Sequence, residues 1–158
     1  MFSVSIPEER RPILIGKNGA TKRFIEKKTN TRIKVGLDIE IEGENELLTG
    51  EIVKAIGRGF SPHRALRLTD SNCLLDVIQI KGTTNKIKRL MSRVIGRYGN
   101  SRRIIEESTG AFVSVYGRTI SIIGTYKEAE HARKAIEMLL TGSKHTTVYK
   151  YLSKLELE

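Results

Sequence analysis

The apolar residues of the chain recur at two spacings, every second residue as in a strand and every third or fourth residue as in a helix. In the first half of the chain these spacings alternate, and the last of them is helical. Residues 2–6 alternate between apolar and polar side chains, which is typical of a strand. In the second of the expected helices, Ala20, Phe24 and Ile25 form the side that we expect to be buried. In chain order, the pattern predicts a strand at 2–6, helices at 12–15 and 20–29, strands at 31–35 and 38–42, and a helix from 44–46 to 56.

The second half repeats this order of elements. The pattern predicts a strand at 74–80, helices at 84–95 and 100–108, strands at 111–115 and 119–123, and a helix at 126–140. Between the halves, Ser61-Pro62 has the sequence of a helix start, and a short helix to about residue 68 should follow. Residues 143–158 carry apolar side chains at helical spacing and predict a final helix. We therefore expect an α+β protein of two similar units, residues 1–70 and residues 71–158.

The two units also share a motif at the level of individual residues. Residues 14–35 align without a gap to residues 94–115, at an offset of 80 (94 minus 14). Each copy contains a Gly-x-x-Gly turn, Gly16–Gly19 and Gly96–Gly99, between an apolar pair and a basic helical segment. Lys54-Ala55-Ile56 recurs as Lys134-Ala135-Ile136 at the same offset, so the repeat extends into the last helix of each unit.

The chemistry of the Gly-x-x-Gly turn favours an anionic strand. Glycine at both ends permits backbone angles and a close approach that a Cβ atom would forbid. The helix after each turn begins with free N–H groups, which favour phosphate oxygens. Lys17 and Arg97 lie inside the turns, and further cations follow in the next helical turn. A single such turn is a weak signal, whereas two copies in the same setting predict a nucleic-acid ligand.

The distribution of charge supports the same ligand. The net charge is +10, from 28 Lys+Arg against 18 Asp+Glu. Residues 1–35 hold nine cations and three anions, and residues 81–103 hold eight cations and no anion. Both basic segments surround a Gly-x-x-Gly turn. An anionic polymer gains affinity from such segments because its counterions are released on binding.

Other functional classes find little support in the sequence. The three histidines lie apart from any Cys, His or Asp cluster, and no nucleophile and base are paired, so we expect no metal, no cofactor and no catalytic residue. A nucleotide-binding loop is excluded because Thr21 stands where its second glycine should be. No stretch approaches the roughly 20 apolar residues of a membrane span. The single cysteine and the lack of an apolar leader at the N-terminus lead us to expect a cytoplasmic protein.

Both copies of the motif resemble the KH (K-homology) domain of type I, which has an apolar pair, Gly-x-x-Gly and an isoleucine a few residues later. The resemblance implies a three-stranded antiparallel sheet packed on three helices in each unit, with a C-terminal helix added to the second. It also implies that a groove holds about four nucleotides of single strand, with the Gly-x-x-Gly loop against the backbone. The residues expected to bind RNA are Gly16, Lys17, Asn18, Gly19, Lys22, Arg23, Gly96, Arg97, Tyr98, Gly99, Arg102 and Arg103.

Three longer segments, IGRGFSPHRAL, RRIIEESTGAFVSVYGRTISIIG and HTTVYKYL, are similar to those of the archaeal two-KH proteins related to a eukaryotic small-subunit assembly factor. That resemblance covers nearly the whole chain. It implies binding near the 3′ end of small-subunit rRNA or its precursor, and a role in ribosome assembly. It further implies partnership with a maturation endonuclease and with the alpha subunit of translation initiation factor two.

Several alternatives remain open at the level of sequence. Leu14, Ile15 and Ile25, with Val94, Ile95 and Ile105 in the second unit, could form the apolar floor of a groove or belong to the core. The Tyr98 side chain could stack on a base or pack against its own loop. The segment Asp38–Glu51 carries six anions, so the protein could instead be a scaffold that binds a basic partner. An enzyme such as a nuclease is a third hypothesis, which no visible constellation of residues supports.

Overall fold

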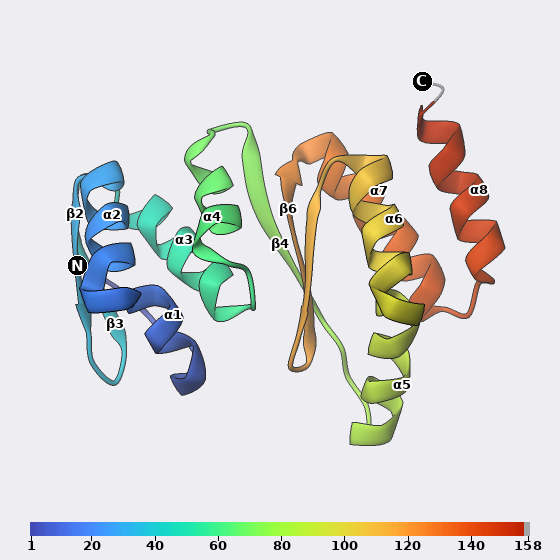
Figure 1. Cartoon of the computed structure of the whole chain (residues 1–158), viewed down its shortest axis with the longest axis horizontal. Helices are drawn as coiled ribbons and strands as arrows, with labels where there is room; N and C mark the ends of the chain where they lie inside the picture. The colour runs from blue at the N-terminus through green and yellow to red at the C-terminus, as the bar shows by residue number, and fades with distance from the viewer. Residues whose placement is uncertain (157–158) are drawn as a thin grey trace. The chain divides into compact units, whose positions relative to one another are not determined.

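A computed structural model describes residues 1–156, and the chain forms two compact units that divide between Ser71 and Asn72. Figure 1 shows the first unit in blue to green and the second in green to red. The division lies one residue from the boundary expected between residues 70 and 71. Each unit contains its own three-stranded sheet.

The first unit has the order β-α-α-β-β-α, with short 3₁₀ turns between its helices. Its sheet is antiparallel with the strand order β1-β3-β2. Proline at the start of α1 and of α4 fits the first helical turn, where no N–H partner is needed. The elements are β1 (Phe2–Val4), η1 (Glu8–Arg10), α1 (Arg11–Ile15), η2 (Lys17–Gly19), α2 (Ala20–Thr29), β2 (Thr31–Val35), β3 (Ile39–Gly43), α3 (Glu46–Gly57), α4 (Pro62–Ala65) and η3 (Leu66–Thr69).

The second unit repeats this order and adds one helix. Its sheet is antiparallel with the strand order β4-β6-β5, so the central strand again comes last in the chain. The α+β fold predicted from the sequence is therefore confirmed in both units. The elements are β4 (Cys73–Gln79), α5 (Thr84–Ile95), η4 (Arg97–Gly99), α6 (Asn100–Thr109), β5 (Phe112–Tyr116), β6 (Thr119–Thr125), α7 (Tyr126–Leu140) and α8 (His145–Glu156).

The two hairpins have turns of different length, although the sequence repeat aligns without a gap. In the first unit Val35 pairs with Ile39, which leaves a three-residue turn. In the second unit Tyr116 pairs with Thr119, which leaves a two-residue turn that begins with Gly117 at φ 56°. A positive φ at the first turn residue is typical of the tight turns that match strand twist. The register of the last strand is therefore shifted by one residue between the units.

The buried face of helix α2 is narrower than the positions of its apolar residues suggest. Ile25 is fully buried and Thr29 nearly so, one helical turn apart. Ala20 and Phe24, which we expected on the buried side, are exposed, with 55% of Phe24 accessible. The expectation was wrong because Phe24 precedes Ile25 by one residue, and one residue turns a helix by about 100°. Phe24 therefore points away from the stripe that contacts the sheet.

The core of the second unit extends from the sheet to the last helix. Ile120 and Ile122 of β6 pack with Ile136 and Leu139 of α7 in one apolar cluster. Val148 and Leu152 of α8 are buried in the same cluster, one turn apart on that helix. The predicted C-terminal helix is thus present, and it packs against α6 and α7 as an integral part of the unit (Figure 1).

Candidate nucleic-acid interface

The two Gly-x-x-Gly turns have the same backbone geometry. In the first turn φ is 73° at Gly16, 54° at Asn18 and 77° at Gly19; the corresponding values in the second turn are 73°, 55° and 73°. Residues other than glycine rarely adopt such angles, because the Cβ atom crowds the carbonyl oxygen. The middle residues are nevertheless asparagine and tyrosine. The left-handed strain at these positions is therefore a feature shared by both turns.

The first and second glycines of each turn are required for different reasons. A Cβ atom at Gly16 would lie 2.9 Å from the backbone nitrogen of Thr21, and one at Gly96 would lie 2.8 Å from that of Ser101. The first glycine therefore lets the turn pack against the following helix. A Cβ atom at Gly99 would have no atom within 4 Å. The second turn therefore leaves the surface of Gly99 bare, so that another backbone can approach it.

The arginine after each turn makes the two surfaces different. In the first unit Arg23 donates from its guanidinium to the carbonyl oxygen of Asn18 at 2.8 Å, and it lies against Gly19. In the second unit Arg103 donates to the side-chain oxygen of Asn100 at 2.6 Å. The second turn is thus open above Gly99, whereas the first is partly covered by an arginine.

The side chains inside the turns project into solvent. Lys17, Asn18 and Arg97 are exposed, and 97% of Tyr98 is accessible. Tyr98 therefore does not pack against its own loop, which was one of the two alternatives left open by the sequence. A large aromatic ring held outside the protein on a strained backbone is suited to stacking on a ligand.

The helices that follow the turns begin without a side-chain cap. Neither α2, after Gly19, nor α6, after Gly99, has a side chain bonded to its first N–H groups. Neither helix carries an acidic residue in its first turn. The partial positive charge of a helix start is therefore available to an anion beside each turn.

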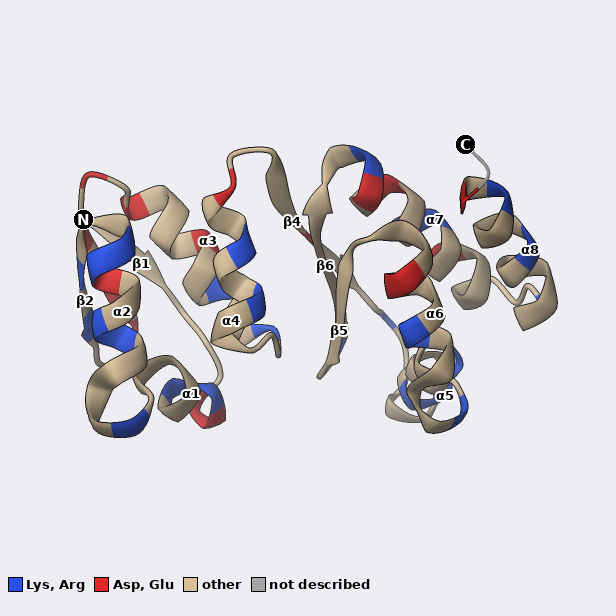
Figure 2. Ribbon diagram, turned by 45° about the horizontal axis from the view of Figure 1, so that its top comes forward, with Lys and Arg blue, Asp and Glu red and all other residues tan. Residues whose placement is uncertain are grey.

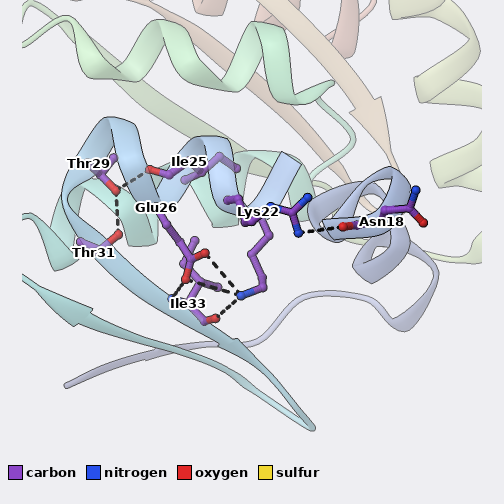
Figure 3. A network of polar contacts seen from close by, with 8 residues as sticks. Asn18, Lys22, Ile25, Glu26, Thr29, Thr31 and Ile33 are labelled. Carbon is purple, nitrogen blue, oxygen red and sulfur yellow. Dashed lines mark hydrogen bonds and ion pairs between the residues drawn. The ribbon is translucent and has the colours of Figure 1, made fainter. Parts of the chain in front are cut away.

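Two of the predicted RNA-binding cations have a role within the fold. Lys22 donates to the carbonyl oxygen of Ile33 at 3.0 Å and lies 3.4 Å from the Glu26 carboxylate, which accepts from the N–H of Ile33 at 2.8 Å (Figure 3). Both backbone groups of one residue in the edge strand β2 are thus satisfied by one pair of side chains, i and i+4 on α2. In the same way Arg102 and Glu106 bond the carbonyl oxygen and the N–H of Val113 at 3.2 and 2.8 Å.

Contact of Lys22 and Arg102 with RNA stays a prediction, but the structure gives both a reason to be basic without it. Glu26 and Glu106 align at the offset of 80, yet the sequence did not indicate their partners. Their presence at the same position of both copies was the available signal. A glutamate that occurs in both copies of a basic segment is expected to have a bonding partner in the fold.

We expect Glu106→Ala to destabilise the second unit by about 1–3 kcal/mol, because it leaves the Val113 N–H without its acceptor and removes the ion-pair partner of Arg102. Glu107→Ala is the matched control, since Glu107 is exposed on the same helix and should change stability by less than about 0.5 kcal/mol. Urea unfolding of the two variants measures the difference. Equal stability of the two would show that the edge-strand bonds contribute nothing.

An open groove of 490 Å³ lies beside the second turn. Its wall is formed by Ile87, Met91 and Ile95 of α5, and it continues to Val115 of β5 and Arg118 of the hairpin turn. Ile95 is 37% exposed, whereas Val94 and Ile105 are fully buried. In the first unit Leu14 and Ile25 are likewise fully buried and Ile15 is half-buried. Only the second residue of each apolar pair therefore reaches the surface, and the others belong to the core.

Positive charge follows the helices around both turns. Figure 2 shows Lys and Arg along α2, α5 and α6. The helix α5 carries Lys86, Lys88, Arg89 and Arg93 and no acidic residue. Within residues 1–156 no group of three or more His, Cys, Asp and Glu side chains could hold a metal ion, and no helix has the length and apolarity needed to cross a membrane.

Comparisons with known proteins match both units. A family model described as the eukaryotic type KH domain, KH-domain type I, matches residues 72–156, and a KH domain model matches residues 1–53. A KH domain-containing protein of Methanocaldococcus jannaschii is 41% identical and covers 96% of this chain and 72% of its own length. The RNA-binding protein pno-1 of Caenorhabditis elegans is 28% identical over 83% of this chain, which spans 49% of that relative.

Solved structures agree along nearly the whole chain. The crystal structure of Dim2p from Pyrococcus horikoshii has a TM-score of 0.89 at 44% identity and covers 97% of this chain and 98% of its own. A crystal structure of an a/eIF2alpha, aDim2p and rRNA complex from the same organism has a TM-score of 0.89 at 43% identity, over 97% of this chain and 92% of the matched chain. The fold, the duplicated turn and these matches together show that the chain belongs to the type I KH-domain family, with one KH domain in each unit.

Proposed function

We propose that the protein binds single-stranded RNA through its two Gly-x-x-Gly turns. The observation that carries the proposal is the pair of turns with equal, strained backbone angles, each followed by an uncapped helix start and each exposing a cation, Lys17 or Arg97. The cations attract the strand, the bare surface of Gly99 allows its backbone to approach the second turn, and the groove beside Ile95 accepts unstacked bases. A Pyrococcus relative at 43% identity forms a complex with rRNA, which supports this ligand.

We propose further that the RNA is small-subunit rRNA or its precursor near the 3′ end, bound during ribosome assembly in the cytoplasm. The expected test is crosslinking in cells followed by sequencing of the bound RNA. Enrichment at the 3′ end of small-subunit rRNA would support the assignment. An even distribution over messenger RNAs would contradict it and leave a general RNA-binding protein.

The phosphate contacts can be counted from the salt dependence of binding. For single strands each contact contributes about 0.7 to the slope of log K against log salt concentration. Lys17→Gln and Arg97→Gln should each lower the slope by about that amount, because each side chain is exposed beside its turn. Lys54→Gln, an exposed position on α3, is the control and should leave the slope unchanged.

We propose that the protein acts without catalysis. The described residues include no group able to hold a metal ion, and the RNA-binding surface is built from cations, glycines and apolar side chains. Incubation of an oligonucleotide with pure protein, with and without a divalent metal, should leave it intact. Cleavage that persists in repeated preparations would contradict the proposal.

A role as a scaffold between RNA and protein is the second candidate. The hairpin and helix of the first unit expose Leu37 and Leu47, at 90% and 67%, among acidic residues. However, Glu40 and Glu42 stand directly opposite Lys34 and Arg32 on the neighbouring strand, so their charge is offset within the sheet. The acidic character of this surface is therefore weaker than the sequence suggests.

The partners proposed for the scaffold are the alpha subunit of initiation factor two and a maturation endonuclease. The first is supported by the Pyrococcus complex, which contains a/eIF2alpha together with aDim2p and rRNA. After nuclease treatment to remove RNA, the protein should still bind each purified partner in a pull-down. Recovery only in the presence of RNA would contradict direct contact.

A further inference from the structure

A cavity lies beside the Gly96–Gly99 turn, on a different face of α5 from the groove. Its volume is 710 Å³, within the roughly 300–1,000 Å³ typical of ligand sites. Four arginines line it, and its lining contains no acidic residue. The arginines are Arg89 and Arg93 of α5, Arg97 of the turn and Arg103 of α6. Such a lining suits a ligand with several phosphates.

The cavity and the groove occupy adjacent sides of α5. Lys88, Met91 and Ile95 line the groove, whereas Arg89 and Arg93 line the cavity. Since each residue turns the helix by about 100°, these two sets lie on different faces. Ser92 lines both and marks the ridge between them. A strand held at the turn therefore has the groove on one side and the cavity on the other.

The walls of the cavity are fixed by the last helix. The ring nitrogen Nε2 of His145 lies 2.9 Å from the carbonyl oxygen of Arg93, and because a carbonyl can only accept, the imidazole donates. The Arg93 guanidinium donates to the carbonyl oxygens of Leu139 and Ser143, so this arginine is engaged within the fold. Tyr149 stands edge-on to His145 with ring centroids 6.1 Å apart and forms part of the lining. The helix α8 thus places an aromatic ring among cations.

Two of the arginines have no competing protein contact. Among residues 1–156, no hydrogen bond or ion pair joins Arg89 or Arg97 to another side chain, and both are exposed. Arg97 and Tyr98 belong to the turn itself, so the cavity is continuous with the Gly96–Gly99 turn. Free guanidinium groups beside tyrosine rings are suited to phosphates and stacked bases together.

The first unit does not carry the same set of residues. At the offset of 80, Arg89 corresponds to Glu9, Arg93 to Ile13, and Tyr98 to Asn18. The segment after the third helix of the first unit is α4, a helix of four residues, rather than a counterpart of α8. The cavity is therefore not a consequence of the repeat.

We propose that this cavity is a second RNA subsite, which takes the nucleotides that follow the clamped ones in the same strand. The inference rests on the proposed function, since it needs a strand held at the Gly96–Gly99 turn. Its ligand is a phosphodiester chain of two or three nucleotides, with a phosphate on Arg89 and a base on Tyr149, while Arg97 joins the subsite to the turn. The second unit then binds a longer segment than the groove alone accommodates.

The test uses the full chain with Lys17→Asp and Asn18→Asp, so that only the second unit binds. Affinities are measured for a four-nucleotide RNA and for two seven-nucleotide RNAs, extended at the 5′ or at the 3′ end. Only one extension should increase affinity, because the cavity lies at one side of the turn. At 0.15 M salt each added phosphate contact should contribute about fourfold.

Arg89→Glu should remove the gain from the extension and leave the four-nucleotide affinity no weaker than in the control. The control is Lys86→Glu, which makes the same charge change at an exposed position of α5 that lines neither cavity nor groove. A gain that survives Arg89→Glu, or no gain from either extension, would overturn the subsite. If the starting protein failed to bind the four-nucleotide RNA at all, the proposed function itself would be overturned, and the subsite with it.

Discussion

Replacement of Lys17, Asn18, Arg97 and Tyr98 by aspartate should weaken RNA binding by more than about 100-fold while the protein stays folded. Two lost phosphate contacts account for about 16-fold at 0.15 M salt, and repulsion by the four new carboxylates adds to this. Loss of Tyr98 removes a stacking contact of roughly 1–3 kcal/mol. All four side chains are exposed, so their replacement removes no packing.

The backbone should accept these changes as well. Asn18 and Tyr98 have φ of 54° and 55°, and aspartate adopts this region more readily than most residues do. The thermal midpoint of the variant should therefore stay close to that of the parent.

A control variant with the same change in net charge separates the effect of the two turns from the effect of the protein's overall charge. Two cation-to-anion and two neutral-to-anion changes alter the net charge by six units, and so do Lys54→Glu, Lys127→Glu and Lys150→Glu together. These three lysines are exposed and line neither the cavity nor the groove. The control should lose much less affinity than the clamp variant. Equal losses, or a folded clamp variant that binds as the parent does, would show that the turns are not the site.

Gly96→Ala should mainly lower stability and Gly99→Ala should mainly weaken RNA binding, although both glycines have φ of 73°. At Gly96 the new Cβ would lie 2.5 Å from the Cβ of Ser101, which is fully buried. The backbone there, with ψ 177°, is also in a region that only glycine enters readily. Strain and overpacking together should destabilise the second unit by about 3 kcal/mol or more.

At Gly99 the new Cβ would meet no atom within 4 Å, and ψ is 13°, in the ordinary left-handed region. Alanine should cost only about 1–2 kcal/mol of stability there. The methyl group would nevertheless stand where the RNA backbone approaches, so binding should weaken by about tenfold, equivalent to 1.4 kcal/mol. Urea unfolding and titration with a short RNA measure the two effects. A Gly99→Ala protein that binds as the parent does would show that no backbone comes close to this glycine.

Local pattern accounts for most of what could be predicted about the fold. The helices Ala20–Thr29, Thr84–Ile95 and Tyr126–Leu140 lie at the residues predicted, since the period of apolar residues is a property of the segment itself. The ends of strands were less well predicted, because they depend on pairing with a neighbour. The one-residue shift between the two hairpins arises from turn lengths that the gapless repeat did not reveal.

Part of the candidate site could be predicted from the sequence, and part of it depends on contacts made only in the fold. The turns, their glycines and the exposed cations inside them were evident from the sequence. The roles of Lys22 and Arg102 within the fold could not be predicted, because their carbonyl partners lie 11 residues later on a strand. The exposure of Phe24 could not be predicted either, because it depends on which side of α2 meets the sheet. The cavity beside the second turn needs α8, whose His145 contacts a residue 52 positions earlier.

By itself, the sequence determined that the protein has two β-α-α-β-β-α units, each with a basic Gly-x-x-Gly turn. Those features follow from local periodicity, from the conformational freedom of glycine and from charge, and none of them requires a distant partner. The tertiary structure alone decided which cations remain free, which apolar residues reach the groove, and that the second turn borders an arginine-lined cavity. These depend on contacts between segments far apart in the chain, because a side chain is available to a ligand only where the fold has not already given it a partner.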